Sequence, residues 1–399
     1  MKNTEFIRNK IRGSLMGGAA GDALGYEVEF MCRQAILSRY GENGITKFEL
    51  DADGKALISD DTQMTLFTAN GLLMGLTRGV MRGVGGRPEY YVPFAYRDWY
   101  YTQVYDRETD NECVYTWLRY LPGMAYRRAP GRTCMNACVD IIRGANVVNN
   151  SKGCGGIMRV APISLLNASF DLREKYVYSI EELAIAACEI AECTHKHPLG
   201  FLPAALLAVL IYKVLPLNLN EVKQDIEHIV AETLDVLDVI YEGKYDDDKR
   251  VLRELSELAV KLAHHDISDV DAISLLGEGW VAEETWAIAL FCVVRHIESF
   301  ENAVITSVNH DGDSDSTGSV CGNIMGAIYG YEYMKERNLF CTKDRELENT
   351  LELSEITLAR ADDLTTGCII NSYEPLDTPE KKQWYERYCM MKPSGIGER

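Results

Sequence analysis

The stretch NHDGDSDSTGSVCGNIMGAIYG, residues 309–330, decides how the chain is expected to fold. It begins with three carboxylates at alternate positions and then two hydroxyl side chains: Asp311, Asp313, Asp315, Ser316 and Thr317. Crowded carboxylates repel one another, and a hard divalent cation such as Mg²⁺, Mn²⁺ or Ca²⁺ offsets the charge. An EF-hand loop opening at Asp311 is excluded because Gly322 stands where the last acidic ligand belongs. An acidic N-cap on an ordinary helix explains the pattern equally well.

Glycine recurs at every fourth position in two distant parts of the chain. The first set lies in a predicted helix over residues 5–24 and the second in the stretch above: Gly13, Gly17, Gly21, Gly25, Gly318, Gly322, Gly326 and Gly330. Each glycine inside a helix costs about 1 kcal/mol relative to alanine, so the repetition needs a reason. Close approach of two backbones is that reason. We therefore expect the two helices to pack against each other in the core.

A second acidic motif precedes another apolar run. Ser59, Asp60 and Asp61 come just before residues 63–73, and their carboxylates are expected at a helix N-terminus. Such a pair is common at helix starts and is a weak signal alone. Two such motifs, from near opposite ends of the chain, are a good way to build a shared metal centre.

The composition restricts the classes of partner. The chain has 399 residues, 47% of them hydrophobic, enough for a sizeable core. A net charge of −19 argues against nucleic acid and anionic membranes as partners. The twelve cysteines form no CxxC pair, which is typical of reduced cysteines in a cytosolic protein. There is neither a signal-peptide pattern nor an uncharged run long enough for a membrane span, so we expect a cytoplasmic location.

Most of the chain has helical periodicity, and no long strand pattern occurs. Residues 216–270 are highly charged and are expected to form a surface helical layer, with Asp246 to Asp248 in a loop. Residues 340–399 read as amphipathic helices followed by a polar tail. These patterns predict an all-α protein.

Three further places are candidates for ligand contacts, each with a plain structural alternative. The glycine-rich residues 151–159 form either an anion-binding loop or an ordinary turn. Trp280, at the start of a predicted helix, either stacks on a planar ligand or belongs to the core. Cys193, His195 and His197 do not have zinc-site spacing, so a histidine here more plausibly forms hydrogen bonds.

These pieces together resemble the ADP-ribosylglycohydrolase family. The matching stretches occur in the family's order: GDALGYEVEF at 21–30, SDDTQMTL at 59–66, GCGGIMRVAP at 153–162, THKHPLG at 194–200 and HDGDSDSTGSVCG at 310–322. The resemblance implies a compact, orthogonal multi-helix all-α domain over residues 1–399, with two Mg²⁺ or Mn²⁺ ions in a cleft between helix ends. It leaves 216–290 as an expanded helical region and 340–399 as C-terminal helices.

Site roles also follow from the resemblance. It implies six metal ligands: Ser59, Asp60, Asp61, Asp313, Asp315 and Ser316. Glu29, unlike Glu27, falls where the family has an acidic residue, so Glu29, Asp60 and Asp61 are the candidates for catalysis. The resemblance assigns binding of the diphosphate and the distal ribose to the glycine-rich loop: Gly153, Gly155, Gly156, Ile157, Met158 and Arg159. His195 is expected to lie beside the same part of the ligand. Trp280 completes the expected substrate contacts. Asp311 is expected to lie outside the set of metal ligands and to support them without contacting the metal.

The implied activity is metal-dependent removal of ADP-ribose from a modified protein, most plausibly by cleavage of the N-glycosidic bond to arginine. HDGDSDST at 310–317 and RRAPGRT at 127–133 resemble the arginine-specific members, whereas the expanded middle region departs from them. A hydrolase for serine-linked or other conjugates is an alternative. A protein that binds ADP-ribose or neutralises an ADP-ribosyltransferase without turnover is another, and a purely structural use of the fold is the third.

Overall fold

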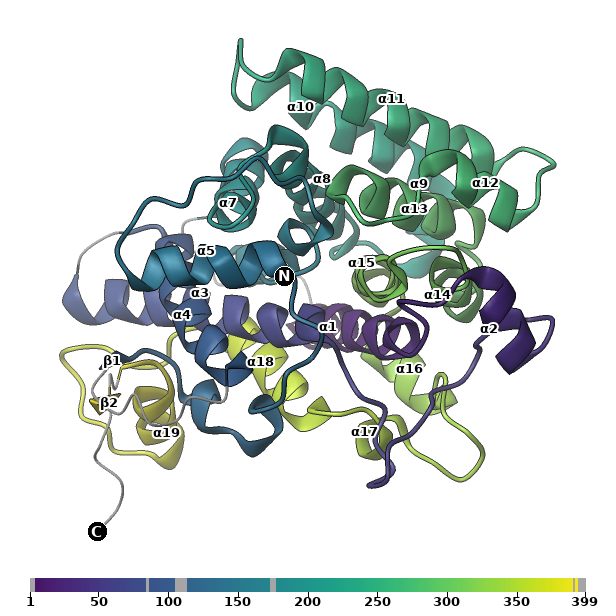
Figure 1. Cartoon of the computed structure of the whole chain (residues 1–399). Helices are drawn as coiled ribbons and strands as arrows, with labels where there is room; N and C mark the ends of the chain where they lie inside the picture. Colours follow the sequence, from purple (N-terminus) through teal and green to yellow (C-terminus); the bar gives the residue numbers. More distant parts are fainter. Residues whose placement is uncertain (1–3, 84–85, 105–112, 173–176, 390–391, 394–399) are drawn as a thin grey trace.

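The computed structural model describes residues 4–83, 86–104, 113–172, 177–389 and 392–393, and helices make up nearly all of its regular structure (Figure 1). The first helices are α1 (Thr4–Tyr26), α2 (Arg33–Tyr40), α3 (Asp60–Arg82), α4 (Val92–Gln103), α5 (Arg132–Ile142), α6 (Ala161–Leu172), α7 (Ile180–Glu192) and α8 (Pro198–Val214). The later helices are α9 (Leu219–Leu234), α10 (Val236–Val239), α11 (Asp246–Ala263), α12 (Asp269–Leu276), α13 (Ala282–Arg295), α14 (Phe300–Val308), α15 (Ser314–Tyr329), α16 (Tyr331–Arg337), α17 (Leu347–Thr350), α18 (Ser354–Thr366) and α19 (Pro379–Tyr388). Short 3-10 turns are η1 (Pro88–Tyr91), η2 (Trp117–Tyr120), η3 (Pro122–Met124) and η4 (Cys154–Gly156). The only strands in the described ranges, β1 (Cys113–Val114) and β2 (Lys392–Pro393), pair antiparallel. The all-α prediction is confirmed.

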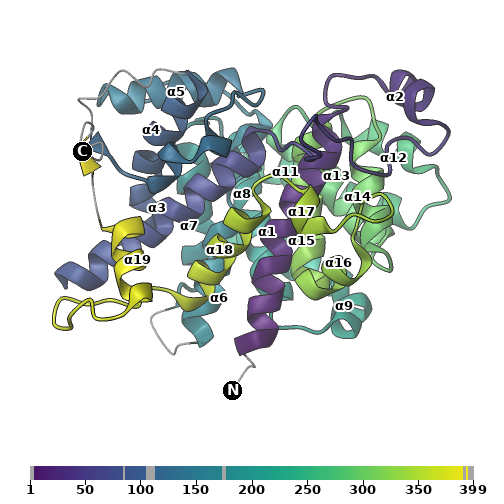
Figure 2. The ribbon, with the colours of Figure 1, turned by 90° about the horizontal axis from the view of Figure 1, so that it is seen from below.

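Helices α1 and α15 lie side by side at the centre, with α3, α4 and α19 on one side and α12 and α14 on the other (Figure 2). The glycines set this contact. A Cβ atom at Gly13, Gly17 or Gly21 would overlap the backbone of Gly326, Gly322 or Gly318, respectively, so the helices are antiparallel and their backbones touch. The expected packing of the two glycine helices is confirmed, and it brings the end of α1 to the start of α15.

Helix α8 is the most apolar helix of the described residues, and it contacts α15. Its sequence, PLGFLPAALLAVLIYKV, is hydrophobic around its whole circumference, as expected for a helix surrounded by others. It packs against α6, α7, α9 and α13. Helix α8 therefore belongs to the apolar interior. The starts of α3 and α15, in contrast, carry acidic side chains in their first turns.

The charged residues 216–270 form an outer layer of helices, as expected, made of α9, α10, α11 and the start of α12 (Figure 1). One detail of the prediction is wrong. Asp246, Asp247 and Asp248 form the first turn of α11 and not a loop. Three carboxylates in a first turn are favourable because the helix dipole attracts them.

Helices α16 to α19, from residue 331 onward, close the side opposite this layer (Figure 1). The expected amphipathic helices are present there, and the predicted polar tail at 394–399 lies outside the described residues. No helix in the described ranges is long and apolar enough to cross a membrane.

Candidate active site

The N-terminus of α3 carries the first acidic motif. Ser59 is the N-cap residue, and its hydroxyl accepts the N–H of Asp61 at 3.1 Å. Asp60 and Asp61 occupy the first turn, where the helix dipole favours negative charge. All three residues are buried, with at most 5% exposed. Burying carboxylates is costly unless hydrogen bonds or a cation compensate, so capping alone does not explain this arrangement.

The N-terminus of α15 carries the second acidic motif. Asp313 is its N-cap residue, and the N–H of Ser316 is shared between Asp313 at 3.2 Å and Asp315 at 2.8 Å. The glycine contact with α1 continues to this point, because a Cβ atom at Gly25 would overlap the backbone of Ser314. The packing of the two glycine helices therefore fixes where these carboxylates lie.

The two acidic motifs lie together. Burial raises the pKa of Asp61 well above its usual range, and the carboxylate of Asp313 raises it further. The Ser316 hydroxyl hydrogen-bonds to Asp61. Burial, followed by the Asp61 carboxylate, likewise raises the pKa of Asp315. Side chains from near the two ends of the chain thus form one acidic cluster, while their roles as metal ligands stay predictions.

Glu29 faces this cluster, and Glu27 does not. Burial raises the pKa of Glu29 to about 9, with further contributions from neighbours including Asp313, and its side chain is within hydrogen-bonding distance of Asp315. The neighbours of Glu27 are instead Glu49 and Arg39. Residues 27–30 form a turn after α1, which directs the two glutamates to different surroundings. Glu29 is the only one of the pair placed to act with the cluster.

Asp22 was missed by the sequence analysis. Its carboxylate is fully buried and accepts the N–H of Ser59 at 3.0 Å, the N–H of Thr62 at 3.0 Å and the Thr62 hydroxyl. Burial raises the pKa of Asp22 to about 6, against the effect of these hydrogen bonds. Asp22 therefore attaches the start of α3 to α1. Its position beside the glycine stripe of a buried helix was the available signal.

The glycine-rich loop lies between the cluster and the start of α13. The Cys154 N–H donates to Trp280 O at 3.2 Å, and the N–H of Ala282 donates to Lys152 O at 2.8 Å. The Cys154 thiol donates to Asp313 at 2.8 Å. The loop is therefore next to the acidic cluster, as the resemblance implies.

The second half of this loop differs from the expected ligand cradle. The amides of Ile157 and Met158 already donate to Cys154 O, at 3.0 and 3.3 Å, and both side chains belong to the core. Gly155 and Gly156 are also buried, and a Cβ atom at Gly156 would overlap Gly200 O. The side chains after Gly156 therefore support the loop from beneath. The N–H groups of Gly153 and Cys154 also have partners, in the Ser151 hydroxyl and Trp280 O, so contact between this loop and a ligand stays a prediction.

Arg159 is completely buried and has no carboxylate partner among the described residues. Its guanidinium group donates to Cys134 Sγ at 3.3 Å and to the Thr194 hydroxyl, and it stacks on Tyr96 at 4.5 Å. The predicted direct contact between Arg159 and substrate is not possible in this conformation. Its positive charge nevertheless lies under the loop.

His195 lies beside the loop and is neutral. A Cβ atom at Gly153 would be 3.3 Å from its Nε2, and its Nδ1 is 2.8 Å from the Thr194 hydroxyl. Burial, helped by the charge of Arg159, lowers the pKa of His195 to about 3. A histidine in this state can donate or accept a hydrogen bond but carries no charge.

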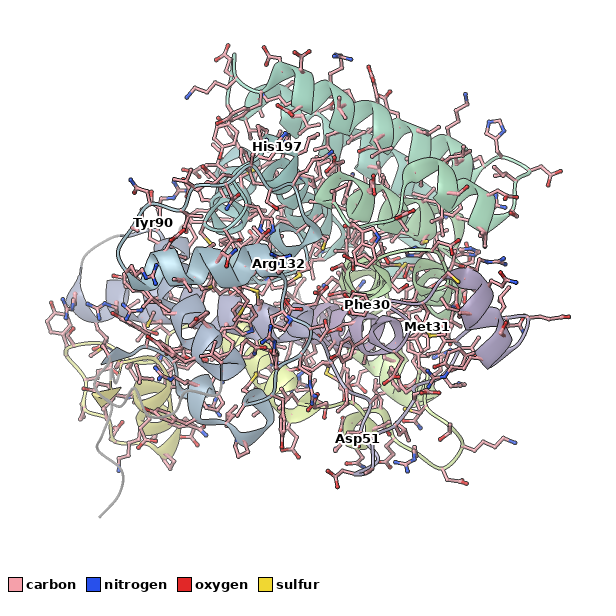
Figure 3. The ribbon with its side chains drawn as sticks, in the orientation of Figure 1. Phe30, Met31, Asp51, Tyr90, Arg132 and His197 are labelled. Atoms are coloured by element: carbon pink, nitrogen blue, oxygen red, sulfur yellow. The ribbon has the colours of Figure 1, made fainter. Side chains whose placement is uncertain are left out.

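Trp280 is on the surface and not in the core. Its ring stacks on Phe30, with centroids 6.2 Å apart and planes 19° apart, and the two residues are 39% and 75% exposed. Figure 3 labels Phe30 and its neighbour Met31 near the ends of α1 and α15. Because Phe30 follows Glu29 directly, this aromatic pair is next to the acidic cluster.

The cluster has the oxygen donors that bind divalent metal ions, although its side chains are not positioned as a complete coordination shell. No group of three or more His, Cys, Asp or Glu side chains in the described ranges is positioned to hold an ion. However, Asp61 Oδ2 and Glu29 Oε2 are buried without a hydrogen-bond partner. Orphaned carboxylate oxygens beside hydroxyl groups are the donors that Mg²⁺ and Mn²⁺ prefer. Rotation of these side chains would be needed to complete the coordination.

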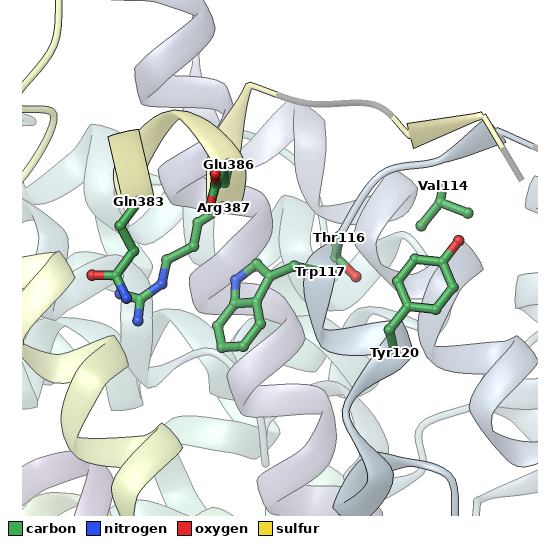
Figure 4. A pocket seen from close by; sticks show the side chains of 7 residues that line it. All are labelled: Val114, Thr116, Trp117, Tyr120, Gln383, Glu386 and Arg387. Atoms are coloured by element: carbon green, nitrogen blue, oxygen red, sulfur yellow. The ribbon is translucent and has the colours of Figure 1, made fainter. Parts of the chain in front are cut away.

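One surface pocket lies away from all of these residues. Figure 4 shows it between η2 and α19, with Trp117 and Arg387 in its wall. Its volume is about 330 Å³. The guanidinium group of Arg387 lies 5.2 Å from the Trp117 ring. None of the predicted site residues lines this pocket, so it adds nothing to the candidate active site.

Comparison with known sequences identifies the family to which this all-α chain belongs. The ADP-ribosylglycohydrolase family model matches residues 3–367. The chain belongs to this family.

Individual relatives are more distant. The chain is 27% identical over 218 residues to ADP-ribosylhydrolase ARH3 of Bos taurus, which covers 50% of this chain and 56% of the bovine protein. The protein of the same name from Danio rerio is 24% identical over 358 residues, covering 81% of this chain and 84% of that protein. The chain thus spans little more than half the length of the bovine relative.

A solved structure described as an ADP-ribosylglycohydrolase-related protein complex has the same fold. It superimposes with a TM-score of 0.59 over 91% of this chain and 99% of that chain, at 21% identity. At this level of identity the likeness concerns the fold alone.

Proposed function

We propose that this protein hydrolyses the bond between ADP-ribose and a modified protein side chain, with Mg²⁺ or Mn²⁺ as cofactor. The observation that carries the proposal is the meeting of two helix N-termini, which bring Asp60 and Asp61 together with Asp313 and Asp315. Membership of the family, and relatives named ADP-ribosylhydrolase, support it.

The residues that would hold two divalent ions are those at the helix starts: Ser59, Asp60, Asp61, Asp313, Asp315 and Ser316. Bound ions of this kind supply positive charge that orients ribose hydroxyls and makes water more acidic. The chain contributes rigid placement of the ligands, since Asp22 fixes the start of α3 and the glycine contact fixes the start of α15.

Glu29 and Asp60 are the groups we assign to proton transfer. They are the most exposed acids of the cluster, at 9% and 5%, and Glu29 Oε2 has no partner. Burial raises the pKa of Glu29 to about 9 and that of Asp60 to about 8. A protonated Glu29 can give its proton to the leaving group. A divalent ion bound beside Asp60 would favour its carboxylate form, which could then take a proton from the attacking water. The transition state of glycoside cleavage has oxocarbenium character, which nearby carboxylates stabilise.

Arginine is the linkage that we propose first, and serine or another side chain is the alternative. The arginine-type segment RRAPGRT at 127–133 lies against the cluster: the N–H of Asp60 donates to Arg128 O at 3.0 Å, and that of Gly131 donates to Asp60 at 3.4 Å. This segment can therefore shape the part of the site where the modified side chain enters.

The proposal is tested by release of ADP-ribose from arginine-, serine- and aspartate-linked substrates, with and without EDTA. We expect metal-dependent release from the arginine conjugate. Asp60→Ala and Asp315→Ala should each lower turnover by at least about a hundredfold while the helical circular dichroism signal persists. Retained turnover in both variants would contradict the proposal. Tight binding of ADP-ribose without any turnover would favour a binding protein.

The neighbouring glutamates provide a matched pair of variants. Glu29→Gln should reduce kcat strongly because it removes an ionisable group facing the cluster. Glu27→Gln is the same substitution two residues earlier in the chain. Because Glu27 lies beside Glu49 and Arg39 and not beside the cluster, this variant should keep a turnover close to that of the unmodified protein. Equal losses in both variants would refute the role of Glu29.

A further inference from the structure

A second pocket, of about 550 Å³, lies beside the acidic cluster, between α12, the start of α13 and the loop that precedes α15. We call it the α12–α13 pocket. Its apolar wall includes Ile273 and Val281, and Trp280 forms an aromatic side. None of the proposed catalytic or metal-binding residues lines it, and Trp280 is the one expected substrate contact that it shares with the candidate active site.

Every ionisable side chain that lines this pocket is acidic or a neutral histidine. Glu278 and Asp311 are exposed and form no ion pair with any described residue, while Glu284 is half-buried. Glu284 accepts the N–H groups of Glu278 at 3.0 Å and Gly279 at 3.2 Å and therefore holds this segment in place. The pocket thus combines negative charge with apolar surface, which suits a cation on an aliphatic stem.

One residue that lines the pocket, His310, has a buried hydrogen-bond acceptor without a partner. His310 is only 2% exposed, and its Nε2 lies 3.0 Å from Ser307 O and 3.0 Å from the Thr317 hydroxyl. A carbonyl oxygen can only accept, so Nε2 carries the proton and Nδ1 keeps a lone pair. This Nδ1 atom has no hydrogen-bond partner in the described part of the chain. Its lone pair adds negative potential where a donor would enter.

The wall of the pocket is continuous with the candidate active site. Glu278 O accepts the N–H of Asp313 at 2.8 Å, and Trp280 O accepts the N–H of Cys154 at 3.2 Å. Residues 278–281 therefore separate the pocket from the acidic cluster and the glycine-rich loop. A peptide residue spans at most about 3.6 Å, so a residue roughly two to four positions from a modified side chain could reach the pocket.

We infer that the α12–α13 pocket binds an unmodified arginine side chain of the protein substrate, close in sequence to the residue that carries ADP-ribose. The inference rests on the proposed function for its account of the substrate. A guanidinium group has five N–H donors, which suit the carboxylates of Glu278 and Asp311, and its flat face stacks on an indole such as Trp280. The buried lone pair of His310 adds to the negative potential that attracts the cation. Lysine has the charge but lacks the flat face, so it should bind more weakly.

Direct binding tests the pocket without requiring turnover. The probe is N-acetyl-arginine amide, and N-acetyl-citrulline amide is its uncharged counterpart of the same shape. Nitrogen NMR of the histidine side chains should show the Nδ1 signal of His310 shifting and saturating with the arginine probe only. No shift with arginine, or the same shift with citrulline, would overturn the inference even if the protein proves to be a hydrolase.

Kinetics tests the link to the substrate. Peptides with one ADP-ribosylated arginine and a neighbouring arginine should have a KM roughly threefold to fivefold below that of peptides with citrulline there, at equal kcat. Glu278→Gln should abolish this difference and leave hydrolysis of free ADP-ribosyl-arginine unchanged. Glu42→Gln removes one exposed charge elsewhere and should preserve the difference. An identical KM for both peptides in the unmodified protein would refute this use of the pocket, whereas absence of any turnover would count against the proposed function alone.

Discussion

Arg159 carries a positive charge that no described carboxylate neutralises, although it is completely buried. A buried, unpaired charge lowers stability, and methionine would suit the surrounding Cys134 Sγ and Tyr96 ring. We therefore expect Arg159→Met to keep or raise the free energy of unfolding. If the charge under the loop attracts the diphosphate, the same variant should bind ADP-ribose about tenfold more weakly, or ~1.4 kcal/mol.

Titration calorimetry with two ligands separates charge from shape in this prediction. Adenosine has no phosphate, so its affinity should be the same in the unmodified protein and in Arg159→Met. Arg159→Lys keeps the charge and should retain most of the affinity for ADP-ribose. Equal weakening for both ligands would mean that Arg159 only supports the loop.

His195 should make the protein less stable in acid. Its pKa is about 3 in the folded protein and near 6.5 when the chain unfolds, so between these values only the unfolded state binds the proton. Stability from this residue is complete above pH 6.5 and is lost as the pH falls toward 3, by up to about 1.4 kcal/mol per pH unit. Urea unfolding at pH 7 and pH 5 should show that His195→Gln reduces this slope. An unchanged slope would contradict the assigned burial.

At the residue scale, the sequence showed which side chains have suitable chemistry for the site but not which way each side chain points. Asp60 and Asp315 were found because two acidic motifs, each ahead of an apolar run, can together build one metal centre. Asp22 was missed because a single acid inside a helix has no such signature, and only the fold shows that it holds Ser59. Arg159 was assigned to the ligand through the family resemblance, yet its side chain is completely buried.

At the scale of elements, the contact between α1 and α15 determines whether the acidic cluster forms. Gly17→Ala would place a methyl group onto Gly322 O, where the backbone cannot move aside easily. Alanine normally stabilises a helix by about 1 kcal/mol relative to glycine, but overpacking costs roughly 1–3 kcal/mol and should prevail. We expect a lower free energy of unfolding by urea and weaker metal binding, because the start of α15 shifts.

Gly86→Ala is the control for this substitution. A Cβ atom there meets no other atom within 4 Å, and the backbone has no positive φ. Its stability should match that of the unmodified protein. If Gly17→Ala is equally stable, the glycine contact does not set the positions of the carboxylates.

The start of a helix was easier to predict from sequence than the way in which loops pack against distant segments. The helix start at Ser59 was visible in sequence because its cap uses a local hydrogen bond. Local patterns could not show which face of the loop after Lys152 meets solvent, since that depends on Trp280 O and Gly200 O from distant segments. Long-range backbone contacts of this kind leave no periodic signal.

At the scale of the whole molecule, negative charge must be balanced locally for the proposed chemistry. The net charge is −19, and five acids gather at one site: Glu29, Asp60, Asp61, Asp313 and Asp315. An ADP-ribose diphosphate would add further negative charge. Divalent ions in the cluster and Arg159 under the loop are the two positive sources that this arrangement offers, so removal of either should weaken ADP-ribose binding.

Divalent ions should accordingly stabilise the folded protein as well as support turnover. A ligand that binds only the folded state at a hundred times its Kd adds ~2.7 kcal/mol, which for a chain of this length raises Tm by about 3 °C. We expect Mg²⁺ or Mn²⁺ to produce such a rise in a thermal unfolding experiment and EDTA to reverse it. Sodium chloride at equal ionic strength should not reproduce the rise, because screening acts on exposed charges more than on buried ones. The variant Asp61→Asn should lose the response, because it removes one of the orphaned carboxylate oxygens. If that variant responds fully, the ions bind elsewhere on this acidic chain and the cluster is not their site.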